Sequence, residues 1–338
     1  MLSENLIIIN NEKVYEEEGN FFCENLDLKV LPEELNNYHK VKYIVRSSKK
    51  KNHQKVNLKN IDISSNIINF LFKIYNTFKN KNSSYLLISI TPYTFLSFIL
   101  LYFFKKKIFI YLFSNGYEEY KHILGNWSVW IYHIMYKIVT SNSEVIVCHE
   151  RLSNKNNKHI VYISRLDNEW LTNHKNASLE KKNFLYVGRI SPEKGIEDFF
   201  KIFEKLDFDA RLSVVGNLST EEKKIKNVNF YGYVSDPKTL ISIYDNHNIT
   251  ILPSYTEATP YVVDESLARL RPVIIFEDIK YIKRNKEGIF ISKRDINSFS
   301  QNANFIINNY SSIQKKMSEN KLPTKDSMIQ QLSKIIKN

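Results

Sequence analysis

The feature that most limits how this chain can fold is a series of short, continuous apolar runs in its C-terminal half. Between several of these runs lie stretches with the periodicity of amphipathic helices. Strands that are apolar on both faces are typical of parallel sheets covered by helices on each side, and their crossovers are right-handed. The pattern therefore predicts a doubly wound α/β domain. Its expected strands are 184–188, 211–216, 228–232, 249–253, 272–276 and 288–292, and its expected helices are 196–206, 237–244, 260–270, one or two over 296–317, and 325–336.

The N-terminal half shows a less regular α/β pattern. Because 338 residues exceed the usual size of a single hydrophobic core, we expect two domains. Segment 171–182 has few large apolar residues and is the expected linker. We predict an N-terminal domain over 1–178, a C-terminal domain over 179–322 and a terminal helix within 323–338. The expected N-terminal strands are 6–10, 41–46, 85–90, 107–113, 144–149 and 159–164, and the expected helices are 63–78 and 125–138.

One apolar stretch, 85–104, is nearly long enough to span a membrane and is followed by three lysines. Pro92 divides it into a strand-like run and a helix-like run, and 107–113 resembles a further buried strand. A strand–helix–strand unit inside a globular sheet is therefore the favoured interpretation. Attachment to a membrane interface and a true span are the alternatives.

The formal net charge of +12 has three interpretations: compositional bias toward lysine, an anionic membrane surface, or nucleic acid. No nucleic-acid motif is present, so we expect no nucleic-acid partner. The two cysteines, Cys23 and Cys148, form no disulfide framework, and the N-terminal apolar run is too short for a signal peptide. These features favour a reducing cytoplasm.

Two cations follow the first expected strand of the C-terminal domain. Arg189 and Lys194 lie in the loop that begins at Gly188. Ligands of open α/β sheets bind beyond the carboxyl ends of the strands, where a guanidinium fork and a mobile ammonium suit a diphosphate. A glycine at the strand end allows close approach of the backbone. A solvated basic loop is the alternative.

Two carboxylates follow the strand at 249–253. Glu257 lies in the loop, and Glu265 lies within the helix that is expected to begin near Pro260, with Thr259 as its N-cap. The free N–H groups of such a helix start attract anions. A phosphate site flanked by two acids suits a sugar nucleotide. Ordinary helix charge, with Glu265 paired to Arg269, is the alternative.

Taken in order, these motifs resemble the retaining glycosyltransferases of family GT4, which have the GT-B fold. The motifs are VGRISPEKG (187–195), PSYTE (253–257), EATPYVVDE (257–265) and RPVI (271–274), together with the stretch 231–254. The resemblance covers about 150 residues, from 180 to 330. It implies two facing, doubly wound Rossmann-like domains, with the donor on the C-terminal domain and the acceptor on the N-terminal one. It also implies that the terminal helix, 323–338, crosses back to the first domain.

The resemblance assigns roles to individual residues. Arg189 and Lys194 would bind the donor diphosphate, Glu265 the ribose hydroxyls, and Glu257 the sugar near its anomeric carbon, with Glu257, Arg189 and Lys194 as the catalytic set. Such enzymes use a UDP- or GDP-sugar and need neither a bound metal nor a further cofactor. The remaining expected donor-site residues are Gly188, Tyr233, Val234, Ala258, Thr259, Pro260 and Tyr261.

Some positions depart from the family pattern. Ala258 replaces the usual glycine after the first glutamate, and Leu270–Arg271 replaces the usual Cys-Gly. In the N-terminal half the first strand is followed by only one glycine, Gly19, and the family's histidine-containing turn falls at 113–122, where Ser114, Asn115 and Gly116 stand.

We therefore predict a retaining hexosyltransferase that acts in polysaccharide or glycolipid assembly on a glycan or lipid-linked acceptor. The basic segment 40–59 and the aromatic helix 95–104 predict a peripheral location at the inner face of an anionic membrane. The alternative function is a catalytically silent sugar-nucleotide-binding or assembly subunit.

Overall fold

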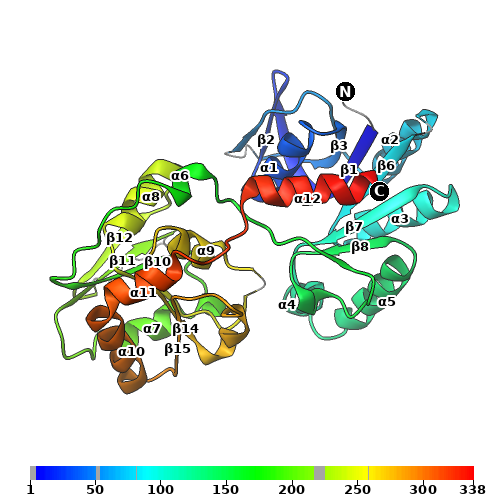
Figure 1. Ribbon diagram of the computed structural model, residues 1–338. Helices are drawn as coiled ribbons and strands as arrows, with labels where there is room; N and C mark the ends of the chain where they lie inside the picture. The colour runs from blue at the N-terminus through cyan, green and yellow to red at the C-terminus, as the bar shows by residue number, and fades with distance from the viewer. Residues whose placement is uncertain (1–4, 51–53, 81, 217–224, 258) are drawn as a thin grey trace. The chain divides into compact units, whose positions relative to one another are not determined.

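The computed structural model describes residues 5–50, 54–80, 82–216, 225–257 and 259–338. The chain divides into two compact units (Figure 1). Unit 1 comprises Met1–Ile163 and Asp326–Asn338, and unit 2 comprises Ser164–Lys325. Residues 326–338 of the terminal helix are thus part of unit 1.

Unit 2 contains a six-stranded parallel sheet whose strand order reverses at its centre. The order is β12-β11-β10-β13-β14-β15. Strands β11 and β12 thus extend the sheet on one side of β10, and β13, β14 and β15 extend it on the other side. All six predicted strands are confirmed, with ends that move by one or two residues. Their bounds are β10 Lys182–Val187, β11 Ala210–Val215, β12 Val228–Gly232, β13 Ile249–Leu252, β14 Val273–Phe276 and β15 Ile289–Ser292.

Helices cover both faces of this sheet, as the continuous apolar runs require. Phe184 and Tyr186 of β10 belong to a core cluster with Phe199, whereas Leu185 points the other way, into a cluster with Tyr244. The predicted helices are confirmed, and 296–317 forms two of them. Their bounds are α7 Ile196–Phe203, α8 Pro237–Asp245, α9 Tyr261–Ala268, α10 Ile296–Asn308 and α11 Tyr310–Met317, and a further short helix, α6 Asn168–Leu171, was not predicted.

Unit 1 also contains a parallel sheet, in the order β5-β3-β1-β6-β7-β8-β9. The predicted end of the first strand is wrong, because β1 continues to Glu17 and turns back at Glu18 and Gly19 into the antiparallel β2. The predicted strand 159–164 is also wrong in length, since β9 has only two residues. The bounds are β1 Asn5–Glu17, β2 Asn20–Cys23, β3 Lys40–Ser47, β4 Gln54–Val56, β5 Ile61–Ser64, β6 Ser83–Ile88, β7 Lys107–Leu112, β8 Glu144–Val147 and β9 His159–Ile160.

Helices α2 (Ile67–Asn76), α3 (Pro92–Phe103) and α5 (Ser128–Ser141) pack on one face of this sheet. The predicted start of the first of these helices, at residue 63, is wrong, because Ile61–Ser64 pairs with β3. The strand–helix–strand interpretation of the long apolar stretch is confirmed by β6, α3 and β7. In the described ranges, no helix combines the length and the hydropathy that a bilayer span requires.

The remaining helices of unit 1 were not predicted, apart from the terminal one. The two helices that were not predicted are α1 (Leu26–Leu35) and α4 (Gly116–Leu124). The predicted terminal helix is α12 (Lys325–Lys337), whose residues beyond Lys325 belong to unit 1. The His39 imidazole, which follows α1, forms a 3.0 Å hydrogen bond with the Ser333 hydroxyl of α12. Burial and the nearby Lys337 lower the pKa of His39 to about 4, so the imidazole is neutral at pH 7.

We predict that acidification weakens unit 1 through His39. Because the folded pKa lies below the ordinary value near 6.5, the stabilisation is complete above that value and is lost as pH falls toward 4. Thermal unfolding measured between pH 7.5 and 5 should show a larger loss of stability in the wild type than in His39→Gln. Parallel pH profiles for the two proteins would refute this assignment.

We further predict that one buried ion pair is essential to unit 2. The Arg269 guanidinium makes two 2.9 Å hydrogen bonds to Asp245, which joins α8 to the end of α9, and donates to the carbonyls of Trp170 and Thr172. Asp245→Asn should lower the free energy of unfolding by about 3 kcal/mol, because a buried guanidinium loses its counterion. The same change at Asp209, in the exposed pair with Lys181, should leave the denaturation midpoint almost unchanged.

Candidate functional site

The candidate site lies where the strand order of unit 2 reverses. In open parallel sheets the crevice at such a reversal, beyond the carboxyl ends of the strands, is the usual ligand site. The loop after β10 carries Arg189 and Lys194, and the loop after the adjacent β13 carries Glu257. The Lys194 ammonium lies 2.6 Å from a Glu257 carboxylate oxygen, so the structure brings these two predicted residues together.

The two loops approach each other closely because residue 195 is a glycine. Gly195 has a φ of +63°, and a Cβ there would lie 2.2 Å from the carbonyl oxygen of Pro253. The backbone N–H of Tyr255 donates to the Glu193 carbonyl at 3.0 Å. Arg294, which follows β15, donates to the carbonyls of Pro253 and Ser254. These contacts hold Lys194 and Glu257 in register.

Glu257 is fixed by several neighbours besides Lys194. The Ser254 hydroxyl donates to the same carboxylate oxygen at 2.6 Å. The Tyr281 hydroxyl accepts from the Glu257 N–H at 3.2 Å and donates to its carbonyl. Only 8% of the Glu257 side chain is exposed. The carboxylate is therefore held in one place.

Arg189 differs from Lys194 in being exposed to solvent. Its side chain is 75% exposed and has a 3.3 Å contact with Glu193. A short hydrogen bond from Ser191 holds the pKa of the Glu193 carboxyl below its ordinary value, so this acid stays charged. The Arg189 carbonyl accepts from the buried Tyr186 hydroxyl at 2.6 Å, which anchors the backbone beneath the guanidinium.

Gly188 ends β10 at a point of close backbone packing. Its N–H donates to the Val215 carbonyl at 2.9 Å. A Cβ on the neighbouring Gly216 would lie 1.9 Å from the Gly188 carbonyl oxygen. Position 216 therefore requires glycine, whereas a Cβ at position 188 would lie 3.0 Å from the Tyr186 hydroxyl.

Glu265 lies deeper than Glu257, inside α9. Its carboxylate accepts a 2.9 Å hydrogen bond from the Tyr244 hydroxyl of α8. Burial, and after it the Glu265 charge, raise the pKa of Tyr244 well above its ordinary value, so the hydroxyl keeps its proton and donates. The Arg269 guanidinium, the alternative partner considered from the sequence, binds Asp245.

The start of α9 differs by one residue from the prediction. The helix begins at Tyr261, and Pro260 rather than Thr259 is the N-cap, with no side-chain capping bond. Pro260 itself is extended, with φ −77° and ψ 111°. The Arg165 guanidinium lies 4.1 Å above the Tyr261 ring. Ala258 lies outside the described residues.

The two residues predicted near the base lie apart from the charged pair, after β12. Tyr233 is 62% exposed, whereas Val234 packs against the core cluster that contains Leu185 and Tyr244. Sequence reasoning missed Ser254, Tyr281 and Arg294. Ser254 stood inside the quoted PSYTE motif, but the other two follow different strands and had no local signal.

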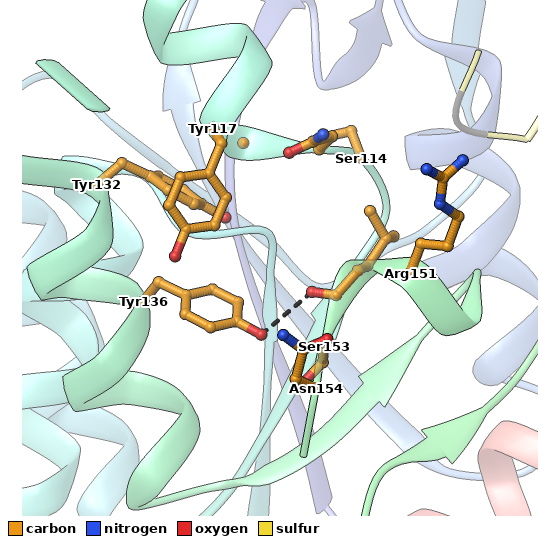
Figure 2. A pocket seen from close by; sticks show the side chains of 10 residues that line it. Ser114, Tyr117, Tyr132, Tyr136, Arg151, Ser153 and Asn154 are labelled. Carbon is orange, nitrogen blue, oxygen red and sulfur yellow. Dashed lines mark hydrogen bonds between the residues drawn. The ribbon is translucent and has the colours of Figure 1, made fainter. Parts of the chain in front are cut away.

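A second candidate site is a pocket of about 100 Å³ in unit 1 (Figure 2). Tyr117, Tyr132 and Tyr136 line one side of it, and polar residues after β7 and β8 line the other. Gly116 is required, because a Cβ there would lie 2.2 Å from the Tyr132 ring. The polar residues include the Ser114–Asn115–Gly116 turn noted in the sequence, and Arg151, Ser153 and Asn154.

Comparison with known proteins gives a family match over the C-terminal half. Residues 167–322 match the family model described as glycosyl transferases group 1. The capsular polysaccharide biosynthesis glycosyltransferase CapM of Staphylococcus aureus is 31% identical over 165 residues, which cover 44% of this chain and 42% of CapM. The chain spans about half the length of the curated relatives it matches.

Solved structures resemble the whole chain. HepE of Anabaena, in complex with UDP, has a TM-score of 0.72 at 10% identity, covering 98% of this chain and 99% of HepE. Sucrose-phosphate synthase of Thermosynechococcus elongatus has a TM-score of 0.70 at 16% identity, covering 99% and 98%. The predicted GT-B fold is confirmed by this likeness.

We predict that Lys194 and Glu257 are energetically coupled. In a double-mutant cycle with Lys194→Met and Glu257→Gln, urea unfolding should give a coupling free energy of about 1–3 kcal/mol, because the pair is largely shielded from water. The matched cycle with Arg189→Met and Glu193→Gln, in the same loop, should give less than about 1 kcal/mol, because that pair is exposed. Equal coupling in the two cycles would contradict the fixed arrangement described above.

Proposed function

We propose that this chain, whose residues 167–322 match the family model of the glycosyl transferases group 1, transfers a sugar from a nucleoside diphosphate to an acceptor hydroxyl. The observation that carries the proposal is the Lys194–Glu257 pair at the strand reversal of unit 2, with α9 beginning after the same strand. The UDP in the structure of HepE, a protein of the same fold, supports a nucleoside diphosphate.

We place the donor diphosphate between Lys194, Arg189 and the start of α9. An ammonium has three donors, so Lys194 can bind a phosphate oxygen while it keeps Glu257. The exposed ion pair between Arg189 and Glu193 contributes little free energy, so Arg189 can bind a phosphate oxygen instead at little cost. The start of α9 follows the loop that carries Glu257, and the positive end of a helix dipole attracts an anion. Gly188 lets the backbone approach the same phosphates.

The rest of the donor extends along the carboxyl edge of the sheet. Glu265, oriented by Tyr244, accepts the ribose hydroxyls, and Tyr233 and Val234 lie toward the base. Glu257 lies near the anomeric carbon. The backbone of Thr259, Pro260 and Tyr261 covers the sugar and the phosphates.

We assign the acceptor to the pocket in unit 1. Its tyrosine rings suit the apolar face of a sugar, and its hydroxyl, amide and guanidinium groups suit the hydroxyls. CapM takes part, by name, in capsular polysaccharide biosynthesis, which favours a glycan or lipid-linked acceptor here too.

In the proposed reaction the bond between the anomeric carbon and the diphosphate oxygen breaks, and the acceptor oxygen bonds to that carbon with retention. The acceptor proton passes to the leaving diphosphate. Lys194, Arg189 and the start of α9 stabilise the charge that develops on the leaving group, which is the largest contribution that fixed donors can make.

The donor site is tested by binding. Nucleoside diphosphates and UDP- and GDP-sugars, titrated in a thermal-shift assay, should raise the melting temperature for at least one base. Lys194→Met and Arg189→Met should each weaken that ligand about 10- to 100-fold, because each removes a charge-assisted contact. Lys201→Met, which removes a 72% exposed lysine on α7, is the matched control and should bind normally. No shift with any nucleotide would reject the donor site.

The enzymatic role is tested by turnover with the best donor. Glu257→Gln should lower the rate of transfer or of donor hydrolysis at least about 100-fold, while nucleoside diphosphate binding persists. The reason is that Glu257 is placed closer to the sugar than to the phosphates. Binding by the wild type without turnover of any donor would instead support a catalytically silent sugar-nucleotide-binding subunit.

A further inference from the structure

The exposed apolar side chains of this protein are concentrated on one part of unit 1. Among the described residues, 20 large hydrophobic side chains are exposed, and 14 of them lie between Ile68 and Ile138. The other six lie in unit 2. Soluble proteins scatter such residues singly, so a concentration of this kind marks an interaction surface.

These side chains lie on the outer faces of adjacent helices. Helix α3 contacts α2 on one side and α5 on the other, and α4 contacts α5. The inner faces of α2, α3 and α5 are buried on the sheet, so their other faces point away from it (Figure 1). We call the outer faces of α2, α3, α4 and α5 the α2–α5 layer.

Helix α5 shows the pattern most clearly. Its buried residues include Tyr132, Met135 and Val139, yet its opposite face is also apolar. That face carries Trp130, Ile134 and Ile138, and Trp127 precedes it. Trp127 and Trp130 are 65% and 67% exposed. Tryptophan at such exposure is typical of the boundary between water and lipid.

Helix α3 points the same way. Its sequence, PYTFLSFILLYF, has no charged residue, and Phe103 at its end is 78% exposed. A helix that is apolar all round is usually buried in a protein core or in a membrane. With twelve residues α3 is too short to cross a bilayer. A helix of this kind at a surface is best accounted for by contact with an apolar phase.

The charge around the layer is positive. From residue 63 to residue 143 the sequence has eight lysines and only two acids, Glu118 and Glu119. Lys79, Lys105 and Lys137 are exposed at the ends and edges of these helices. Lysine is depleted from the centres of protein–protein interfaces, whereas lysines beside aromatic residues attract anionic lipid headgroups.

We propose that the α2–α5 layer docks this protein on a membrane surface that contains anionic lipids. Trp127, Trp130 and Phe103 enter the headgroup region, and the lysines bind the lipid phosphates. This inference stands apart from donor binding, which uses unit 2. It also places the contact on different residues from the basic segment 40–59, much of which forms β3 and β4.

The tryptophans make the test specific. The chain has three, and the third, Trp170, is buried in unit 2 with 4% exposure. With phosphatidylglycerol vesicles, the fluorescence of the full chain should shift to the blue and be quenched by brominated lipid, while pure phosphatidylcholine vesicles should have little effect. Binding should weaken as salt is raised. Absence of quenching, or equal binding to the two kinds of vesicle, would overturn the proposal.

Matched variants locate the contact and keep the reporters. Phe103→Gln/Ile134→Gln should lower the vesicle partition coefficient at least about tenfold, because two apolar side chains no longer enter the lipid. Phe305→Gln/Ile291→Gln removes an exposed phenylalanine and an exposed isoleucine from unit 2 and should bind like the wild type. Circular dichroism melting should be unchanged in both. Equal loss in both variants would overturn the proposal in favour of a non-specific effect. A wild-type protein that binds no vesicles but forms a dimer, which the first variant dissociates, would overturn it in favour of a second copy of the chain.

Discussion

A parallel sheet whose strand order reverses has, at the reversal, two neighbouring strands whose following connections run in opposite directions. The connections from β10 and β13 run toward opposite edges of the sheet, and their loops lie side by side beyond its carboxyl ends, where Gly195 lets them touch. In unit 2 these two loops carry the cations and the carboxylate that define the candidate site. The positions of Arg189, Lys194, Glu257 and the start of α9 all follow from this one topological constraint.

The site also needs rigidity, which the topology alone does not provide. Gly195 permits the loops to touch, and Arg294 and Tyr281 tie the second loop down from strands further along the sheet. The two cations then have different characters. Lys194 is held against Glu257 and is partly shielded from water, whereas Arg189 projects into solvent. A shielded charge held against Glu257 and an exposed charge in the same loop together suit a leaving group whose charge grows during the reaction.

The sequence predicted unit 2 well because its signals are local. Each strand is a continuous apolar run, and each helix shows the periodicity of an amphipathic helix. The local pattern and the tertiary contacts therefore favour the same secondary structure. The proximity of Lys194 and Glu257 was also predictable, since both follow strands of one sheet. Tyr244, Tyr281 and Arg294 were not, because each reaches the site from another element through side-chain contacts. Unit 1 was predicted less well for the same reason. The continuation of β1 into a hairpin depends on pairing with β2 and β4, and β5 exists only because β3 lies beside it.

The apolar surface of unit 1 shows a further limit of pattern reasoning. Residues 125–138 predicted a helix, and α5 is one, but the period of its apolar residues does not say how many of its faces are covered. Only the packing on the sheet shows that α5 buries the face with Tyr132 and Met135, which leaves the tryptophans on its exposed face. The same holds for α3, whose apolar residues exceed what one face of a sheet can cover. The excess has a physical cost in water, and a lipid surface bearing negative charge removes that cost while using the lysines that flank the layer.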